Sequence, residues 1–104
     1  LKPEVALYVG GMGHKTKNFH NEQLVRRGFG DAAARIQELY LAGRKDEAIA
    51  AVPDEWVDMK SLVGPAARIK QRYRAWEDCG AQTINVRSRQ PAAVEVMAEA
   101  ARLN

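Results

Sequence analysis

One short segment, Thr83-Ile84-Asn85-Val86, is predicted to be a β-strand in a chain that is otherwise predicted to be helical. Three of its four residues are β-branched, which favours an extended backbone. A single strand cannot satisfy its own backbone N–H and C=O groups, because these groups need a neighbouring strand. We therefore predict that the chain is a piece of a larger α/β protein, or that this strand pairs between molecules.

Helices are predicted on both sides of the strand, from Pro65 to Cys79 and from Pro91 to Leu103. The order helix, strand, helix is typical of the end of an α/β unit. Each helix carries apolar residues at helical spacing that we expect to face a core. These residues are Ile69, Tyr73 and Trp76 in the first helix and Val94, Met97, Ala98 and Ala101 in the second, with Glu95, Glu99 and Arg102 facing outward.

The residues before Gly64 predict a series of short helices. Pro3 suits the first turn of a helix, but the apolar run that follows it is too short to assign by periodicity. Ile36, Leu39 and Tyr40 lie at helical spacing and are expected on one buried face. The predicted starts and ends are Asn18 and Gly28, then Asp31 and Gly43, then Lys45 and Val52, and finally Asp54 and Lys60, with Asn18, Asp31 and Asp54 as N-caps.

The composition predicts a small globular domain. The chain has 104 residues, of which 46% are hydrophobic, and it has a net charge of +3. No apolar run is long enough to cross a membrane, and no signal-peptide pattern opens the chain. The single Cys79 excludes an internal disulfide and favours a reducing compartment. We expect a cytoplasmic protein that does not associate with a membrane.

The basic residues are densest at Arg68, Lys70, Arg72 and Arg74, within one predicted helix. Nucleic-acid-binding proteins usually gather their bases on one face or arm, with aromatic residues or glycine motifs between them. Here the 16 bases of the chain are interleaved with 13 acids. A solvated helix face is favoured over a polyanion site, and nucleic acid is not expected to be the partner.

The sequence Gly10-Gly11-Met12-Gly13 lacks the spacing of a dinucleotide-binding or P-loop motif. Two interpretations stay open for it. The glycines mark a helix end that packs closely against another element, which is the favoured interpretation, or their backbone lines the mouth of an active site.

Other candidate residues favour structural roles. His14 and His20 have no carboxylate or cysteine at ligand spacing, so no metal site is predicted. Cys79 lies at a predicted helix end, where the helix dipole disfavours a thiolate. Trp56 and Trp76 are predicted to be core or helix-contact aromatics. No catalytic residue is assigned from the sequence.

Three stretches of the chain together resemble the C-terminal part of luciferase-like monooxygenases, in particular the group that uses the deazaflavin coenzyme F-420. The stretches are "ALYVGGMG", "NFHNEQLVRRGFGDAAARIQELYLAGRKDEAIAAVPDEWVD" and "LVGPAARIKQRYRAWEDCGAQTINV". The resemblance covers roughly positions 3 to 87 in order and without an obvious insertion.

The resemblance implies a (β/α)8 TIM barrel for the complete protein. Residues 1–63 would be the helical excursion after barrel strand seven, and residues 64–104 the last helix, strand and helix. The chain itself is expected to be mainly helical with one short strand. It begins at Leu1 without an initiator Met, and we expect it to enter a longer protein partway through a helix.

The resemblance also implies hydride transfer between coenzyme F-420, or alternatively FMN, and a small organic substrate. Gly10, Gly11 and Met12 would lie at the active-site mouth. Arg87, which follows the strand, would lie near the catalytic face and meet a phosphate or an acidic tail, although a plain basic loop residue is the favoured alternative for it. Most of the cofactor pocket would lie outside this chain, so we expect the fragment alone to be inactive. Its exposed apolar helix faces predict a homo-oligomer.

A second hypothesis is a small basic helical module that binds nucleic acid or an acidic protein. Steeply salt-dependent binding to DNA would favour it. Strand and helix units encoded before Leu1 would favour the barrel.

Overall fold

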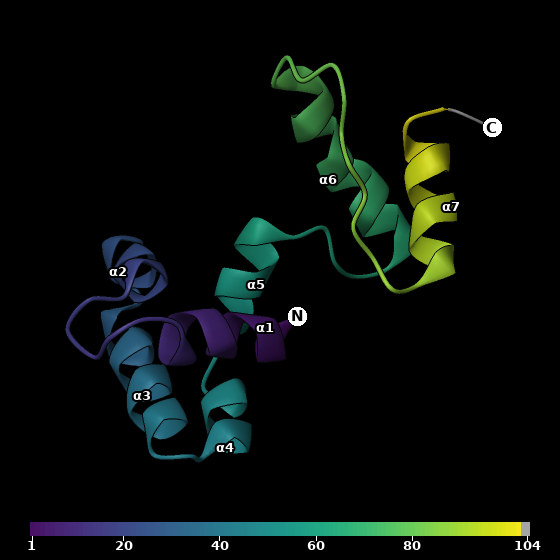
Figure 1. The fold of residues 1–104 in the computed structure, drawn as a ribbon. Helices are drawn as coiled ribbons and strands as arrows, with labels where there is room; N and C mark the ends of the chain where they lie inside the picture. Colours follow the sequence, from purple (N-terminus) through teal and green to yellow (C-terminus); the bar gives the residue numbers. More distant parts are fainter. Residues whose placement is uncertain (103–104) are drawn as a thin grey trace. The chain divides into compact units, whose positions relative to one another are not determined.

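A computed structural model describes residues 1–102 of the chain, which divide into two compact units (Figure 1). The first unit comprises Leu1–Lys60, and the second begins at Ser61. The first unit contains α1 (Lys2–Ala6), the π-helix η1 (Leu7–Gly11), α2 (Phe19–Arg26), α3 (Gly30–Leu41), α4 (Lys45–Ala50) and α5 (Asp54–Lys60). The second unit contains α6 (Ala66–Asp78) and α7 (Pro91–Ala100).

Most of the predicted helices are confirmed, with small changes at their ends. Asn18 is the N-cap of α2, as predicted, and its side chain accepts a hydrogen bond of 3.0 Å from the backbone N–H of Asn21. Gly43 follows α3 with a φ of +81°, a left-handed conformation that glycine adopts without a steric penalty. The prediction that Asp31 caps α3 is wrong, because the helix already begins at Gly30 and Asp31 lies in its first turn.

The predicted strand at Thr83–Val86 is not confirmed. Residues 82–87 have no regular secondary structure, and the β-type pairing found within residues 1–102 is an isolated bridge between His14 and Lys17. The physical reason is that a strand needs a neighbour for its backbone hydrogen bonds, and no neighbouring strand lies within the described residues. The helix after it ends at Ala100, and Leu103, the predicted end, lies outside the described residues.

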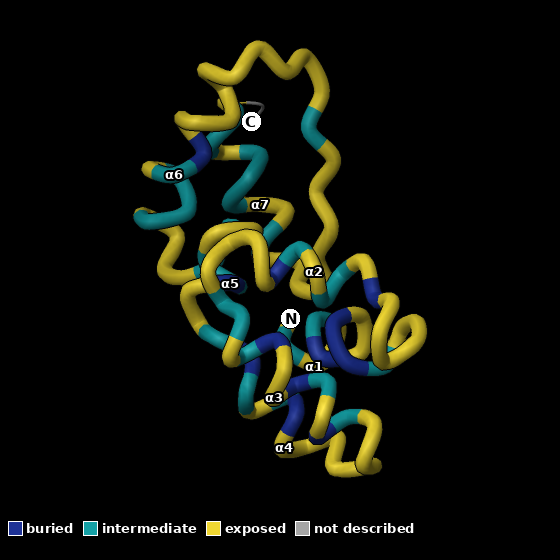
Figure 2. Tube along the Cα trace, turned by 90° about the vertical axis from the view of Figure 1, so that its left-hand side faces the viewer, coloured by how far each residue is buried: buried dark blue, intermediate teal, exposed yellow. Residues whose placement is uncertain are grey.

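The first unit has a closed hydrophobic core, seen as the dark blue segments of its trace in Figure 2. Ile36 and Leu39, predicted to share one face of α3, are both buried there, and Tyr40 packs against the core. Trp56 is also buried, as predicted, with its ring edge-on to Phe29 at 5.8 Å between centroids. The buried members of the core are Ala6, Val9, Leu24, Ala33, Ile36, Leu39, Ala48, Val52 and Trp56.

The side chain of Asn18 joins η1 to α2. It is 5% exposed, and its amide nitrogen donates to the carbonyl oxygens of Tyr8 at 3.2 Å and Val9 at 2.9 Å. Asn21 donates to the same Val9 oxygen at 3.2 Å and to the Ala33 oxygen of α3 at 2.9 Å. A carbonyl accepts two hydrogen bonds, so both asparagines satisfy the end of the π-helix together. We call this pair the asparagine clamp.

The two glycines at the end of η1 allow α3 to approach closely. A Cβ atom on Gly10 would lie 2.6 Å from the Tyr40 Cβ and 3.1 Å from the Ile36 carbonyl oxygen. A Cβ atom on Gly11 would lie 2.4 Å from the Tyr40 ring. Both distances are shorter than van der Waals contact, so any larger residue would push η1 away from α3. The packing interpretation of Gly10-Gly11 therefore has direct geometric support.

The second unit has little core of its own. Among its described residues Tyr73 is the one buried hydrophobic side chain, while Trp76, predicted to be buried or in a helix contact, is 46% exposed. Two helices and a connecting segment bury too little apolar surface to be stable alone. The second unit is thus an open structure, in contrast to the first.

We predict that Asn18→Ala lowers the free energy of unfolding of the first unit by about 1–3 kcal/mol, because it removes an N-cap and the hydrogen bonds to the carbonyl oxygens of Tyr8 and Val9. Asn18→Ser retains a capping oxygen but lacks the amide donors, so its loss should be intermediate. Urea unfolding followed by Trp56 fluorescence in a Trp76→Phe background measures this unit alone. A full recovery with serine would show that the amide bonds to Tyr8 and Val9 contribute nothing.

We predict that Gly10→Ala destabilises the same unit by about 1–3 kcal/mol through overpacking against Tyr40. Gly30→Ala is the matched control, because the nearest atom to its added Cβ is 4.0 Å away, and it should be neutral or stabilising within about 1 kcal/mol. Thermal melts followed by Trp56 fluorescence in the same background compare them. Equal stability of the two variants would contradict the close-packing role of Gly10.

Candidate functional site

The first group of predicted site residues lies where η1 ends. Gly10 is buried and Gly11 half-buried beneath Tyr40, whereas Met12 is 45% exposed. Met12 adopts an extended backbone (φ −96°, ψ 110°) that ends the π-helix and turns the chain outward. Met12 therefore supplies the accessible side chain of this group.

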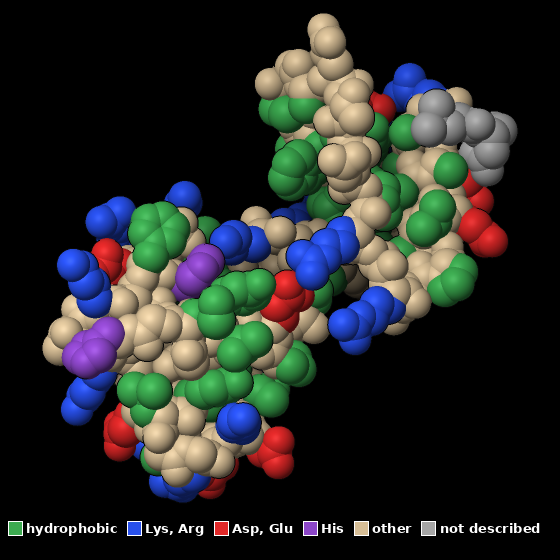
Figure 3. All heavy atoms as spheres, in the orientation of Figure 1, with side chains coloured by type: hydrophobic (Ala, Val, Ile, Leu, Met, Phe, Trp, Pro, Cys, Tyr) green, Lys and Arg blue, Asp and Glu red, His purple; other side chains and the backbone are tan. Residues whose placement is uncertain are grey.

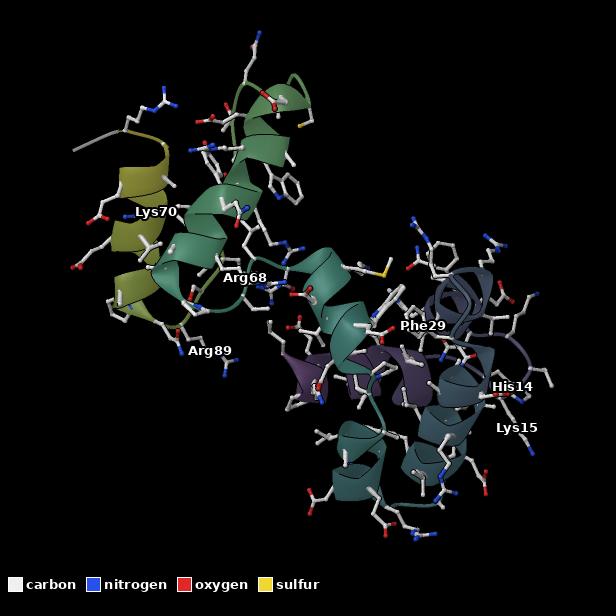
Figure 4. The ribbon with its side chains drawn as sticks, turned by 180° about the vertical axis from the view of Figure 1, so that it is seen from behind. His14, Lys15, Phe29, Arg68, Lys70 and Arg89 are labelled. Carbon is white, nitrogen blue, oxygen red and sulfur yellow. The ribbon has the colours of Figure 1, made fainter. Side chains whose placement is uncertain are left out.

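A tight loop follows Met12. The backbones of His14 and Lys17 pair through two hydrogen bonds of 3.1 Å and 2.9 Å, and His14 Nδ1 lies 3.0 Å from the Thr16 hydroxyl. Figure 4 shows His14 and Lys15 on this loop, at the periphery of the first unit. His14 is exposed and engaged with its own loop, which is the geometry of a turn rather than of a catalytic base.

An aromatic cluster lies beside η1 at Tyr8, close to the start of α2. The His20 ring is 4.8 Å from the Tyr8 ring and 5.8 Å from the Phe19 ring. Tyr8 is 37% exposed and Phe19 63% exposed, so the cluster presents ring surface to the outside. In Figure 3 hydrophobic side chains gather next to a histidine on the visible face of this unit. No sequence pattern predicts this cluster, because the π-helical turn that orients Tyr8 leaves no periodic signal.

The predicted site residue of the second unit, Arg87, lies in the exposed connection between α6 and α7. The preceding residues Ile84 and Val86 line a shallow hollow of about 160 Å³. The rest of the lining consists of Tyr73, Val94, Met97, Ala98 and Ala101. Val94, Met97 and Ala98 of α7 and its C-cap Ala101 are the predicted apolar face of this helix, so the structure brings that face together with the segment predicted as a strand.

The basic cluster of α6 makes contacts within the second unit. Arg68 donates to the Val63 carbonyl oxygen at 2.8 Å and Arg72 to the Ser61 carbonyl oxygen at 3.1 Å. Lys70 forms an ion pair of 2.5 Å with Glu99 of α7, and Figure 4 shows Lys70 between the two helices. Arg68 and Arg72 hold the residues that precede α6 against this helix, and Lys70 holds α6 against α7. These contacts favour the helix-face interpretation over a polyanion site.

No metal-binding group of histidine, cysteine and acidic residues occurs within residues 1–102. Cys79 is exposed, and its thiol donates to the Trp76 carbonyl oxygen at 2.9 Å. At the start of α4, a hydrogen bond from Arg44 lowers the pKa of the Glu47 carboxyl, but this pair lies on the exposed surface. None of the helices formed by the described residues has both the length and the apolar character that crossing a membrane requires.

Comparison with known proteins identifies relatives of the chain. The family of luciferase-like monooxygenases matches residues 3–83. A protein of Mycobacterium tuberculosis, described provisionally as a coenzyme F-420-dependent oxidoreductase, is 39% identical over 80 residues. These residues are 77% of this chain and 23% of that protein, so the chain spans less than a quarter of its relative. No solved structure matches the chain.

The family match extends from α1 through α6 to the start of the segment predicted as a strand. It therefore includes the asparagine clamp, the glycines of η1 and the basic helix. Because the match covers most of the sequence, the chain belongs to the luciferase-like monooxygenase family.

Proposed function

We propose that the chain forms the C-terminal part of an oxidoreductase that transfers a hydride between coenzyme F-420 and a small organic substrate. The observation that carries this proposal is the 39% identity to a relative whose description names that coenzyme. FMN is the alternative cofactor. The bound cofactor would supply the redox chemistry, and the protein would bind it, orient the substrate and exclude water.

The two units would then correspond to different parts of a (β/α)8 barrel. Residues 1–63 would be the helical excursion after strand seven, and residues 64–104 the final helix, strand and helix. The closed core of the first unit supports this division, because an excursion can fold largely on its own. The open second unit supports it too, because Thr83–Val86 would become a strand once neighbouring barrel strands lie beside it.

Within such a barrel Arg87 would face the chemistry, because active sites lie at the C-terminal ends of the strands and Arg87 directly follows Val86. Its guanidinium would bind a phosphate or an acidic tail through paired hydrogen bonds. Gly10 and Gly11 would hold η1 against α3, so that Met12 stands at the mouth of the site. The chain contributes positioning and binding groups, and the remainder of the pocket lies in the rest of the barrel.

The chain by itself is therefore expected to have no activity and no tight cofactor binding. A titration of residues 1–104 with coenzyme F-420, followed by the fluorescence of the deazaflavin, should show no stoichiometric complex. FMN gives the matching titration for the alternative cofactor.

A chimera tests the function. The matched segment of the Mycobacterium tuberculosis relative is replaced by residues 3–83 of this chain, and coenzyme F-420 and FMN are titrated into the chimera and the unaltered relative. We expect the chimera to bind coenzyme F-420 within about tenfold of the affinity of the relative, because the two segments are 39% identical. A chimera carrying Gly10→Ala should bind more weakly, since η1 would be displaced.

The proposal would be contradicted by a folded chimera that binds neither cofactor while the relative binds one of them. Preferential binding of FMN by both proteins would replace coenzyme F-420 with the alternative cofactor.

A further inference from the structure

We infer that Tyr40 and Gly13 are positioning residues for Met12, and that they hold its thioether ready to pack against the ring of a bound deazaflavin. The inference rests on the proposed function, which places Met12 at the mouth of the active site. All the contacts that support it lie within the first unit.

On the N-terminal side of Met12, the ring of Tyr40 fixes the backbone of Gly11. A Cβ atom on Gly11 would lie 2.4 Å from Cε1 and 2.8 Å from Cδ1 of Tyr40, so the ring touches the backbone itself. Tyr40 also packs against the buried core, and the ammonium of Lys45 lies over its ring at 5.5 Å from the centroid. A cation attracts the face of an aromatic ring, so Lys45 helps to keep the ring in this position.

On the C-terminal side of Met12, Gly13 joins the backbone to the start of α2. Gly13 has a φ of +103°, and a Cβ atom on it would lie 2.8 Å from the carbonyl oxygen of Lys17. Two backbone hydrogen bonds between His14 and Lys17 close this loop. Lys17 is followed by Asn18, whose side chain belongs to the asparagine clamp. The backbone that leaves Met12 is therefore attached to a buried network.

Met12 thus carries a 45% exposed side chain on a backbone that is held at both neighbouring residues. A group that is already held in place loses little conformational entropy when it binds a ligand. The thioether of methionine is polarisable and packs favourably against aromatic rings. The deazaflavin supplies such a ring, so the side chain at this position suits the proposed coenzyme.

A spin label on Met12→Cys in a Cys79→Ser background measures how firmly this position is held. We expect Tyr40→Leu to shorten the rotational correlation time of the label about twofold and Tyr40→Phe, which keeps the ring, to leave it unchanged. Gly13→Ala should also mobilise the label. Gly28→Ala is its matched control, because Gly28 has a similar φ of +91° but its added Cβ would meet no atom within 4 Å.

A label on Val25→Cys is the control position, because Val25 lies in α2 and is 50% exposed, close to the value for Met12. Tyr40→Leu should leave this label unchanged. Equal mobilisation at positions 12 and 25 would indicate general loosening of the unit and would overturn the inference. A label at position 12 that does not respond to Tyr40→Leu would overturn it as well.

A double-mutant cycle in the chimera tests the contact with the coenzyme. Met12→Ala and Tyr40→Leu should each weaken coenzyme F-420 binding about fivefold, and the double variant should be no weaker than the weaker single variant, because Tyr40 acts through Met12. Losses that multiply would contradict the positioning role. A chimera that binds neither cofactor would contradict the proposed function and the coenzyme contact with it, whereas the spin labels decide separately whether Tyr40 and Gly13 hold Met12.

Discussion

The side-chain hydrogen bonds of the asparagine clamp connect η1, α2 and α3. The side-chain oxygen of Asn18 caps the N-terminus of α2, and its side-chain nitrogen donates to the carbonyl oxygens of Tyr8 and Val9 in η1. A π-helix leaves carbonyls at its end that regular helical geometry does not satisfy, and here they are buried. Asn21 extends the same network to Ala33 of α3. The close approach of α3 through Gly10 and Gly11 is possible because this end is fixed.

The two units differ in how much apolar surface they bury. Leu24, Ile36 and Val52 are fully buried in the first unit, whereas Tyr73 is the one buried hydrophobic side chain described in the second. The Lys70–Glu99 ion pair joins α6 to α7, but exposed ion pairs contribute little to stability. The second unit therefore leaves large apolar side chains such as Val86 and Val94 exposed.

The sequence predicted what local chemistry determines and missed what depends on distant contacts. Asn18 as a cap, Gly43 after α3 and the buried face of Ile36 and Leu39 all follow from short-range rules, and the structure has them. The amide contacts of Asn18 and the Tyr8–His20 ring contact join residues nine to twelve positions apart, so no local pattern predicts them. The five-residue π-helix is too short to leave a periodic signal. Thr83–Val86 has strand propensity without a strand, because pairing requires a neighbour. The active-site roles proposed for Met12 and Arg87 rest on the family resemblance and not on a contact in the structure.

Residues 1–60 carry a buried core of their own, whereas the backbone of residues 83–86 makes no hydrogen bond to another described residue. Hydrogen–deuterium exchange of the chain in dilute solution distinguishes the two segments, because amide protection reports local stability. We expect strong protection of α2 and α3 and rapid exchange of residues 83–86. Rapid exchange throughout α2 and α3, or strong protection of residues 83–86, would show that the stability of the chain is distributed differently.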